Sequence, residues 1–473
     1  MSVELILGSP LGSVIAPAGC GKTHLLTQVL LEPQLKPVLV LTHTTAGVAA
    51  LKKRLNQMSV PAKNYVLATI DGWALRMINY FPQSCPISCS PNTPQSFYPA
   101  IRASVANHIR TRVVDDLLVA SYSHVLVDEY QDCNIDQHEL ILSLAQHIPT
   151  VIFGDPMQGI FTFAGPVPDW TREVLVKFPV ICTLTVPHRW DNAGASALGN
   201  WLLTTRTNLE NGHPIDLRTC PDYVNWHPLT GNTQHDLRDQ TRAQYSIFGD
   251  YPNDSLLIIG ESTNESSRHS YAQSSSGIDV VEPVQMTGLI HAANLLEQHQ
   301  GLNLVEAVLS IATSLMTNVE KSKLLLRIPS IIAGKNRTPA TVLESELVAL
   351  SQNKATQTIH AVFKLCSDKP GVRVYRKGAL YSLLESLNLA STTDKITITK
   401  AAETVRERIR QQGDRRIPRR AIGSTLLLKG LEADHCLILN ADSRTMDRKN
   451  LYVALTRGAK TVSIFSRSPI ISV

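Results

Sequence analysis

The stretch "VIAPAGCGKTHLL", residues 14–26, limits the possible folds of this chain more than any other segment. An apolar pair precedes the loop and a helical pattern follows it, which is the context that a phosphate-binding loop needs. Glycines in such a loop let backbone N–H groups turn onto phosphate oxygens, and the helix N-terminus adds partial positive charge. The predicted nucleotide-binding residues are Ala16, Pro17, Ala18, Gly19, Cys20, Gly21, Lys22 and Thr23. The loop therefore predicts nucleotide binding, but it does not show what the nucleotide is used for.

A second segment, "SHVLVDEYQDCN" at residues 123–134, places two carboxylates at the end of an apolar run. Open α/β sheets bind their ligands at the carboxyl ends of their strands. We expect Asp128 and the Thr23 hydroxyl to hold Mg²⁺, Glu129 to polarise an attacking water, and Lys22 to contact the β and γ phosphates. Two adjacent carboxylates can also form a solvated turn, but their position after a phosphate-binding loop favours the catalytic interpretation.

Length and composition narrow the class of protein. A chain of 473 residues predicts two to four domains, and 43% apolar residues suffice for folded cores. The net charge of +5 permits a nucleic-acid partner without requiring one. Eight scattered cysteines indicate reduced thiols in a cytoplasmic protein, and no second pair completes a zinc site with Cys85 and Cys89. The N-terminus lacks the features of a signal peptide, and no apolar run approaches the length of a membrane span.

Four later segments carry polar residues in a recurring order. They are "GDPMQ" at 154–158, "VPHRW" at 186–190, "KGLE" at 429–432 and "YVALTR" at 452–457. Together with the phosphate-binding loop and "DEYQD", these segments resemble the ordered motifs of the UvrD/Rep group of superfamily 1 helicases. The resemblance spans residues 16–457, nearly the whole chain.

The resemblance implies an α/β protein with two RecA-like P-loop NTPase domains, which have parallel sheets and hold ATP between them. A small insertion interrupts the first domain, and a larger, mostly helical insertion interrupts the second. The expected bounds are 1–76 and 120–188 for the first domain, 77–119 for its insertion, 189–285 and 418–473 for the second domain, and 286–417 for the larger insertion.

The resemblance also implies roles for single residues. Gln131 and Gln158 match γ-phosphate sensors, and Glu432 matches the position that contacts the ribose of the nucleotide and the motif next to the DNA. Arg189 and Arg457 match arginine fingers from the second domain. An arginine finger is worth roughly 10³–10⁵ in rate in phosphoryl transfer. Without the resemblance, each arginine would be interpreted as part of a surface charge pair.

Single-stranded DNA would cross the tops of both domains. Phe161 and Phe163 match aromatic positions that stack on bases, and His43 and Trp73 are further candidates. Such stacking is worth about 1–3 kcal/mol per base. Because an aromatic residue after a strand more often belongs to a core, both interpretations of these residues stay open.

The chain departs from the family pattern on both sides of the site. Residues 1–13 contain no glutamine to read adenine, with Glu4 the nearest replacement, and His188 stands where a tyrosine usually stacks on the base. The altered positions on the DNA side are Ala164, His43 and Leu426. Because the hydrolytic residues are kept, this pattern favours an ATPase gated by nucleic acid that unwinds duplex poorly.

A narrower resemblance concerns bacterial defence. The exact "DEYQD" segment, Asp71-Gly72-Trp73 and the compact insertions are similar to the helicase-like subunit of Gabija anti-phage systems. That subunit works beside an OLD-family ATPase with a TOPRIM nuclease domain. The resemblance therefore implies such a nuclease as a partner in addition to DNA.

We expect a DNA-dependent ATPase that uses ATP and Mg²⁺ and acts as a 3′-to-5′ translocase or helicase on single-stranded or tailed duplex DNA. One alternative is a regulatory subunit that senses nucleotide and DNA and activates a partner nuclease, with little unwinding of its own. The other alternative is a simple P-loop nucleotide switch.

The segment "RERIRQQGDRRIPRR", residues 406–420, contains seven arginines. Arginine pairs with phosphates and with carboxylates through the same planar group. The segment is interpreted either as a contact surface for DNA or an acidic partner, or as a solvated basic helix.

Overall fold

The computed structural model describes residues 2–90, 93–161, 165–283, 286–393, 396–412 and 418–472. Its described strands form two six-stranded sheets, and the fold is consistent with two RecA-like domains, so the predicted α/β class is confirmed. The chain divides into two compact units. Unit 1 comprises Met1–Pro228, Asp434–Cys436 and Ala441–Val473, and unit 2 comprises Leu229–Ala433 and Leu437–Asn440. The domain bounds expected above stay a prediction.

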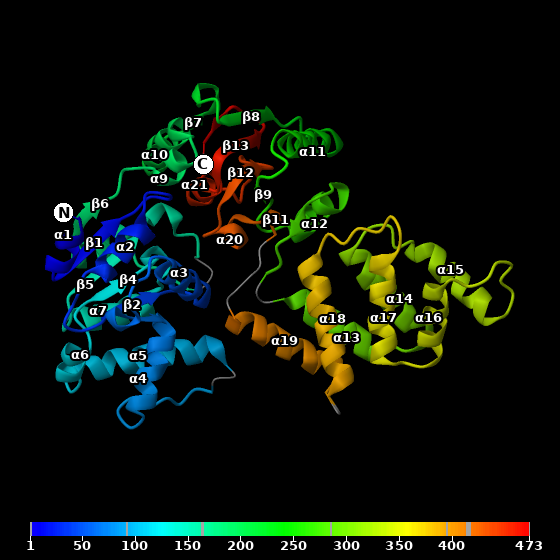
Figure 1. Ribbon diagram of the computed structural model, residues 1–473, viewed down its shortest axis with the longest axis horizontal. Helices are drawn as coiled ribbons and strands as arrows, with labels where there is room; N and C mark the ends of the chain where they lie inside the picture. The colour runs from blue at the N-terminus through cyan, green and yellow to red at the C-terminus, as the bar shows by residue number, and fades with distance from the viewer. Residues whose placement is uncertain are drawn as a thin grey trace. The chain divides into compact units, whose positions relative to one another are not determined.

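The first sheet belongs to unit 1 and has the strand order β3-β2-β4-β5-β1-β6 with parallel pairing throughout. Its strands are β1 Leu11–Ile15, β2 Val38–Thr42, β3 Tyr65–Thr69, β4 Val125–Val127, β5 Thr150–Gly154 and β6 Val180–Thr183. Figure 1 shows helices around this sheet, in blue and cyan. They are α1 Ser2–Gly8, α2 Lys22–Leu31, α3 Thr45–Gln57, α4 Ile70–Tyr80, α5 Pro94–Arg110, α6 Asp115–Ser121 and α7 Ile135–Ala145. The short helix α8, Leu175–Lys177, precedes β6.

Continuous apolar strands explain why this sheet is covered on both faces. Successive side chains of a strand point to opposite faces. Accordingly, Val38 and Val40 of β2 pack into one buried cluster, and Leu39 and Leu41 pack into another. The run "VLVL" thus supplies both cores, and the strand ends remain free to carry polar residues.

The second sheet has the order β10-β11-β9-β12-β13-β8. Its strands are β8 Val224–Pro228, β9 Leu256–Ile259, β10 Asp279–Val280, β11 Arg420–Gly423, β12 Ala433–Ile438 and β13 Gly458–Ser466. Strands β7 Ile215–Asp216 and β14 Ile470–Ile471 form a small antiparallel pair. Besides the helices of the first sheet and those of the helical body described below, the described residues form α9 His188–Asn192, α10 Ser196–Glu210, α11 Thr233–Asp250, α12 Glu265–Ser274, α20 Thr425–Leu428 and α21 Arg448–Leu455.

A helical body in unit 2 has its own apolar core (Figure 1). Leu304, Val308 and Ala312 recur at helical spacing in α14, are fully buried and pack against the neighbouring helices. Its helices are α13 Thr287–Gln298, α14 Gly301–Leu315, α15 Lys321–Ile332, α16 Val342–Gln352, α17 Thr356–Asp368, α18 Lys377–Thr392 and α19 Ile398–Gln412. Among all helices of the described segments, none is long and apolar enough to cross a membrane.

Candidate nucleotide-binding site

The predicted phosphate-binding loop connects β1 to α2 in unit 1. The Ala16 N–H donates to the Gly154 carbonyl at 2.9 Å, which attaches the start of the loop to β5. Gly19 (φ 71°) and Gly21 (φ 88°) lie in the left-handed region, which a side chain disfavours. A Cβ on Gly19 would also lie only 2.6 Å from the Trp190 ring. Backbone conformation and lack of space therefore both require glycine at position 19.

Lys22, the first residue of α2, contacts both strand-end carboxylates. Its Nζ lies 3.0 Å from Asp128 Oδ1 and donates a hydrogen bond to Glu129 Oε1. Burial by itself lowers the pKa of the Lys22 ammonium, but the two carboxylates raise it by more, so its pKa lies above the ordinary value. Burial raises the pKa of Asp128, and the Lys22 charge offsets part of that effect. The three side chains thus form one compact charged cluster beside the loop.

Glu129 has an uncommon backbone conformation. Its φ of 55° and ψ of 40° lie in the left-handed region, which costs a non-glycine residue roughly 1–2 kcal/mol. Such strained residues concentrate at functional sites. The conformation turns the chain from β4 into the short helix η2 (Tyr130–Asp132), where Gln131 Nε2 donates to Glu129 Oε2. Lys22 and Gln131 therefore hold the two oxygens of this carboxylate.

The side chains around Lys22 suit a magnesium ion. Mg²⁺ prefers hard oxygen ligands and keeps several waters, so one or two protein ligands suffice. Asp128 supplies a carboxylate, and its backbone N–H donates to the Leu41 carbonyl at 2.8 Å, which anchors the end of β4 to β2. Thr23, the second residue of α2, supplies a hydroxyl. These two residues would hold the ion, which would neutralise charge on phosphate oxygens.

Asp155, directly after β5, contacts both predicted phosphate sensors. Its backbone N–H donates to Gln131 Oε1 at 3.2 Å, and its Oδ2 accepts a hydrogen bond from Gln158 Nε2 at 3.1 Å. A Cβ on Gly154 would lie 2.8 Å from Gln131 Oε1. The glycine before Asp155 therefore leaves the room that the Gln131 amide occupies.

Arg206 of α10 also contacts Asp155, although it is not among the site residues predicted from the motifs. Its Nε and one terminal nitrogen lie 3.0 and 2.8 Å from Asp155 Oδ1. A signal for it exists in the sequence, because Leu198, Leu202 and Leu209 form the buried face of α10 and position 206 falls on that face. A charged residue within an apolar helical stripe indicates a buried partner.

Two side chains from distant segments lie against the loop. The Tyr452 hydroxyl of α21 accepts a hydrogen bond from the Ala18 N–H at 3.1 Å, and burial raises the pKa of this tyrosine well above its ordinary value. The His188 ring lies beside Gly21, since a Cβ there would be 3.2 Å from His188 Cδ2. His188, which replaces the tyrosine that usually stacks on the base, is therefore close to the loop.

The two predicted arginine fingers have different surroundings. The Arg189 backbone N–H donates to the Gly19 carbonyl at 3.1 Å, and its side chain donates to the Thr456 carbonyl at 2.8 Å. Arg457 is only 2% exposed, and its Nε donates to the Val453 carbonyl of α21 at 2.7 Å. Arg189 thus lies beside the loop, whereas Arg457 packs on α21, the helix that ends two residues before it.

The predicted DNA contacts are not all brought together. The rings of His43 and Phe161 lie 5.8 Å apart at the carboxyl-end edge of the first sheet. Trp73 is 2% exposed, packs in the core on one face of that sheet, and its Nε1 lies 3.4 Å from the Tyr122 hydroxyl. In this conformation Trp73 offers no accessible ring face to a base. Phe163 lies outside the described residues, as does the altered position Ala164.

The remaining sequence candidates belong to unit 2. Glu432 is exposed and follows α20. Residues 413–417 of the arginine-rich segment lie outside the described residues. The Arg420 guanidinium lies 3.7 Å from the centre of the Phe248 ring and donates to the Pro252 carbonyl at 2.9 Å. At least this arginine is already engaged in packing within unit 2.

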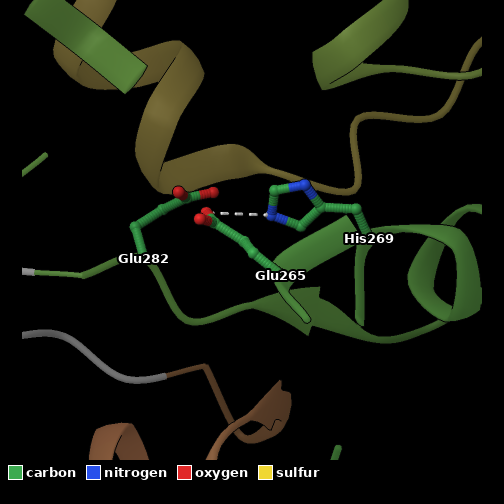
Figure 2. Close-up of side chains that lie close together, drawn as sticks. All are labelled: Glu265, His269 and Glu282. Atoms are coloured by element: carbon green, nitrogen blue, oxygen red, sulfur yellow. Dashed lines mark ion pairs between the residues drawn. The ribbon is translucent and has the colours of Figure 1, made fainter. Parts of the chain in front are cut away.

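Glu265, His269 and Glu282 form a second polar cluster, also in unit 2 (Figure 2), with ligand atoms within 4.8 Å of one another. Glu265 Oε1 lies 3.4 Å from His269 Nε2, one turn along α12. Burial, and next the charge of the nearby Arg376, lower the pKa of His269 to about 4. Both oxygens of Glu282 accept hydrogen bonds from Arg376, at 2.6 and 2.7 Å. Because Arg376 adds positive charge and occupies Glu282, an ion-pair network explains this cluster better than a metal site.

Comparison with known protein families finds a match within unit 1. Residues 100–178 match the model of the UvrD/REP helicase N-terminal domain, and this segment contains Asp128, Glu129, Gln131 and Gln158. The match supports a UvrD-like helicase superfamily and suggests an ATP-hydrolysing DNA helicase, a class that generally uses ATP with Mg²⁺. No curated protein sequence matches the chain.

Proposed function

We propose that this chain is a DNA-stimulated ATPase that couples hydrolysis to 3′-to-5′ movement along single-stranded DNA. The cluster of Lys22, Asp128 and Glu129 beside the loop carries the proposal, because it combines a phosphate-binding cation, a metal ligand and a base in one place. The family match over residues 100–178 supplies the link to DNA helicases.

In the proposed reaction, Lys22 leaves the two carboxylates and binds the β and γ phosphates of ATP. Asp128 and Thr23 would hold Mg²⁺, which would supply positive charge to the phosphate oxygens. Glu129 accepts a proton from water while the water oxygen bonds to the γ phosphorus and the bond to the β–γ bridging oxygen breaks. ADP and phosphate are the products, and Glu129 returns its proton to solvent.

Arg189 and Arg457 would stabilise the charge that develops on the transferred phosphoryl group. Arg189 lies beside the loop, whereas the Arg457 guanidinium donates to the carbonyl of Val453. Bringing Arg457 to the phosphate requires its side chain to leave that carbonyl. We infer that DNA binding promotes this change and so controls hydrolysis.

The test is ATP hydrolysis with and without single-stranded DNA, followed by strand displacement on duplexes that carry a 3′ or a 5′ tail. The proposal expects stimulation by DNA and displacement from the 3′-tailed duplex alone. Glu129→Gln serves as the inactive control. Hydrolysis that is independent of DNA would favour the P-loop switch instead.

A second candidate function is a regulatory subunit that senses nucleotide and DNA and activates a nuclease. It is favoured by the burial of Trp73, which removes one predicted base contact among those the structure describes. The resemblance to Gabija systems makes a cytoplasmic OLD-family ATPase with a TOPRIM nuclease domain the partner to test. This role predicts that the nuclease activity of the mixture depends on Lys22, while strand displacement stays undetectable.

A further inference from the structure

The Asp155–Arg206 pair is a buried charge pair next to the proposed reaction centre. Asp155 is 1% exposed and Arg206 is 9% exposed. Two nitrogens of the guanidinium lie 2.8 and 3.0 Å from the same oxygen, Asp155 Oδ1, and the third lies 2.9 Å from Glu210 Oε2. An arginine held by two carboxylates in this way has little freedom to rotate.

The other atoms of Asp155 reach the two predicted phosphate sensors. Oδ2 accepts the hydrogen bond from Gln158, and the backbone N–H donates to Gln131, which in turn donates to Glu129. A continuous chain of contacts therefore leads from Arg206 through Asp155 to the proposed base. Polar networks of this kind hold each member in one orientation when all of their groups are paired.

We propose that Arg206 is a positioning residue for ATP hydrolysis, which acts through Asp155 on Gln158, Gln131 and Glu129. This inference rests on the proposed function. Arg206 binds one oxygen of Asp155 and leaves the other oxygen to Gln158. Without Arg206, the Asp155 carboxylate keeps only the Met157 N–H on Oδ1, so it can rotate and release Gln158. The loss of the buried charge pair would also shift the Asp155 backbone, whose N–H binds Gln131 and through it Glu129.

The test compares Arg206→Gln and Arg206→Lys with the wild-type protein in steady-state ATP hydrolysis with saturating single-stranded DNA. Arg206→Gln is expected to lower kcat by about 100-fold, because a loss of alignment in the catalytic group costs that much. KM should change less than about threefold, since Lys22 and the loop still bind the phosphates. Arg206→Lys keeps a charge near Asp155 and should recover part of the lost kcat.

The matched control is Arg218→Gln. Arg218 forms a similar two-point pair with Asp216, at 2.9 and 2.7 Å, but its side chain is 60% exposed and neither residue contacts the loop residues or Asp155. This control should retain wild-type kcat and KM. Thermal unfolding of each variant reports whether a loss of activity follows from a loss of folded protein.

If Arg206→Gln fails to fold, the double variant Asp155→Asn/Arg206→Gln takes its place in the test. It removes both charges of the pair and therefore leaves no unpaired charge of that pair in the buried site. It should show the same loss of kcat with an unchanged KM. A folded Arg206→Gln or double variant with kcat within threefold of wild type would refute the positioning role. Absence of ATPase activity in the wild-type protein would instead refute the proposed function, and the inference with it.

Discussion

Replacing Glu129 with glutamine should separate ATP binding from ATP hydrolysis. The substitution keeps the size of the side chain but removes one of the two negative charges that hold Lys22. The Glu129 side chain is 36% exposed, and a pair with this exposure is worth about 0.5–1 kcal/mol. Because ATP must draw Lys22 away from this pair, the variant should bind ATP about twofold to fivefold more tightly.

Turnover of the same variant should fall by about 10²–10⁴, the usual contribution of a positioned general base. Titration with a fluorescent ATP analogue gives the dissociation constant, and phosphate release in the presence of single-stranded DNA gives the rate. Lys22→Ala is the comparison, because it should weaken ATP binding as well as lower turnover.

Two results would contradict this reasoning. Tenfold weaker ATP binding by Glu129→Gln would mean that Glu129 does not compete with ATP for Lys22. Turnover close to that of the wild type would mean that another group accepts the proton from water.

Four further predictions concern other parts of the chain. Trp73→Ala should destabilise the protein by about 3–5 kcal/mol in urea unfolding, because it empties a core position, whereas a folded Trp73→Phe protein should keep its DNA affinity. GTP should be hydrolysed within about tenfold of ATP, because two contacts that would read adenine are missing and each is worth roughly 1 kcal/mol; dATP, which lacks only the 2′-hydroxyl, should also stay within about tenfold, and a preference of many hundredfold for ATP over GTP would show that other residues read the base. Replacing Arg415, Arg416, Arg419 and Arg420 with alanine should weaken DNA binding whatever the DNA sequence. It should also lower the slope of log binding constant against log salt concentration by up to about one unit per lost phosphate contact. Unchanged DNA binding with loss of a co-purifying partner would indicate a partner surface, and no change in either would indicate a solvated helix. The pKa of His269 is about 4 in the folded protein, below its unfolded value, so the wild type should lose stability as pH falls from about 6.5 to 4. Unfolding measured across that range should show a loss up to about 3 kcal/mol larger for the wild type than for His269→Gln.

Features that depend on neighbouring residues could be predicted from the sequence. The phosphate-binding loop needs glycines at fixed spacing between a strand and a helix, and that spacing is visible in residues 14–26. The apolar run before Asp128 predicts a buried strand with carboxylates at its end, which is where β4 places them. The order of the motifs, through the resemblance to UvrD/Rep helicases, predicted the α/β class with two RecA-like domains. The buried strand and the glycine-rich loop could be predicted because hydrophobic periodicity and turn chemistry act over a few residues. The two RecA-like domains came from the resemblance alone.

Whether an aromatic or charged side chain is buried was decided only by tertiary packing. Trp73 was a candidate for base stacking, but its ring fills the core on one face of the first sheet. An aromatic residue after a strand has the same local sequence in both situations. The covering helices decide between them, and the single sequence does not specify which helix covers the ring.

The contacts that organise the site also depend on the tertiary structure. Arg206 lies 51 residues from Asp155, and Tyr452 lies 434 residues from Ala18, yet both pairs are within hydrogen-bonding distance. The left-handed backbone of Glu129 is likewise held by Lys22 and Gln131 rather than by its own preference. The sequence by itself determined which chemical groups are available and at which strand ends they stand. The packing of distant elements decided which of those groups meet, because hydrogen bonds between remote residues leave no periodic pattern in the chain.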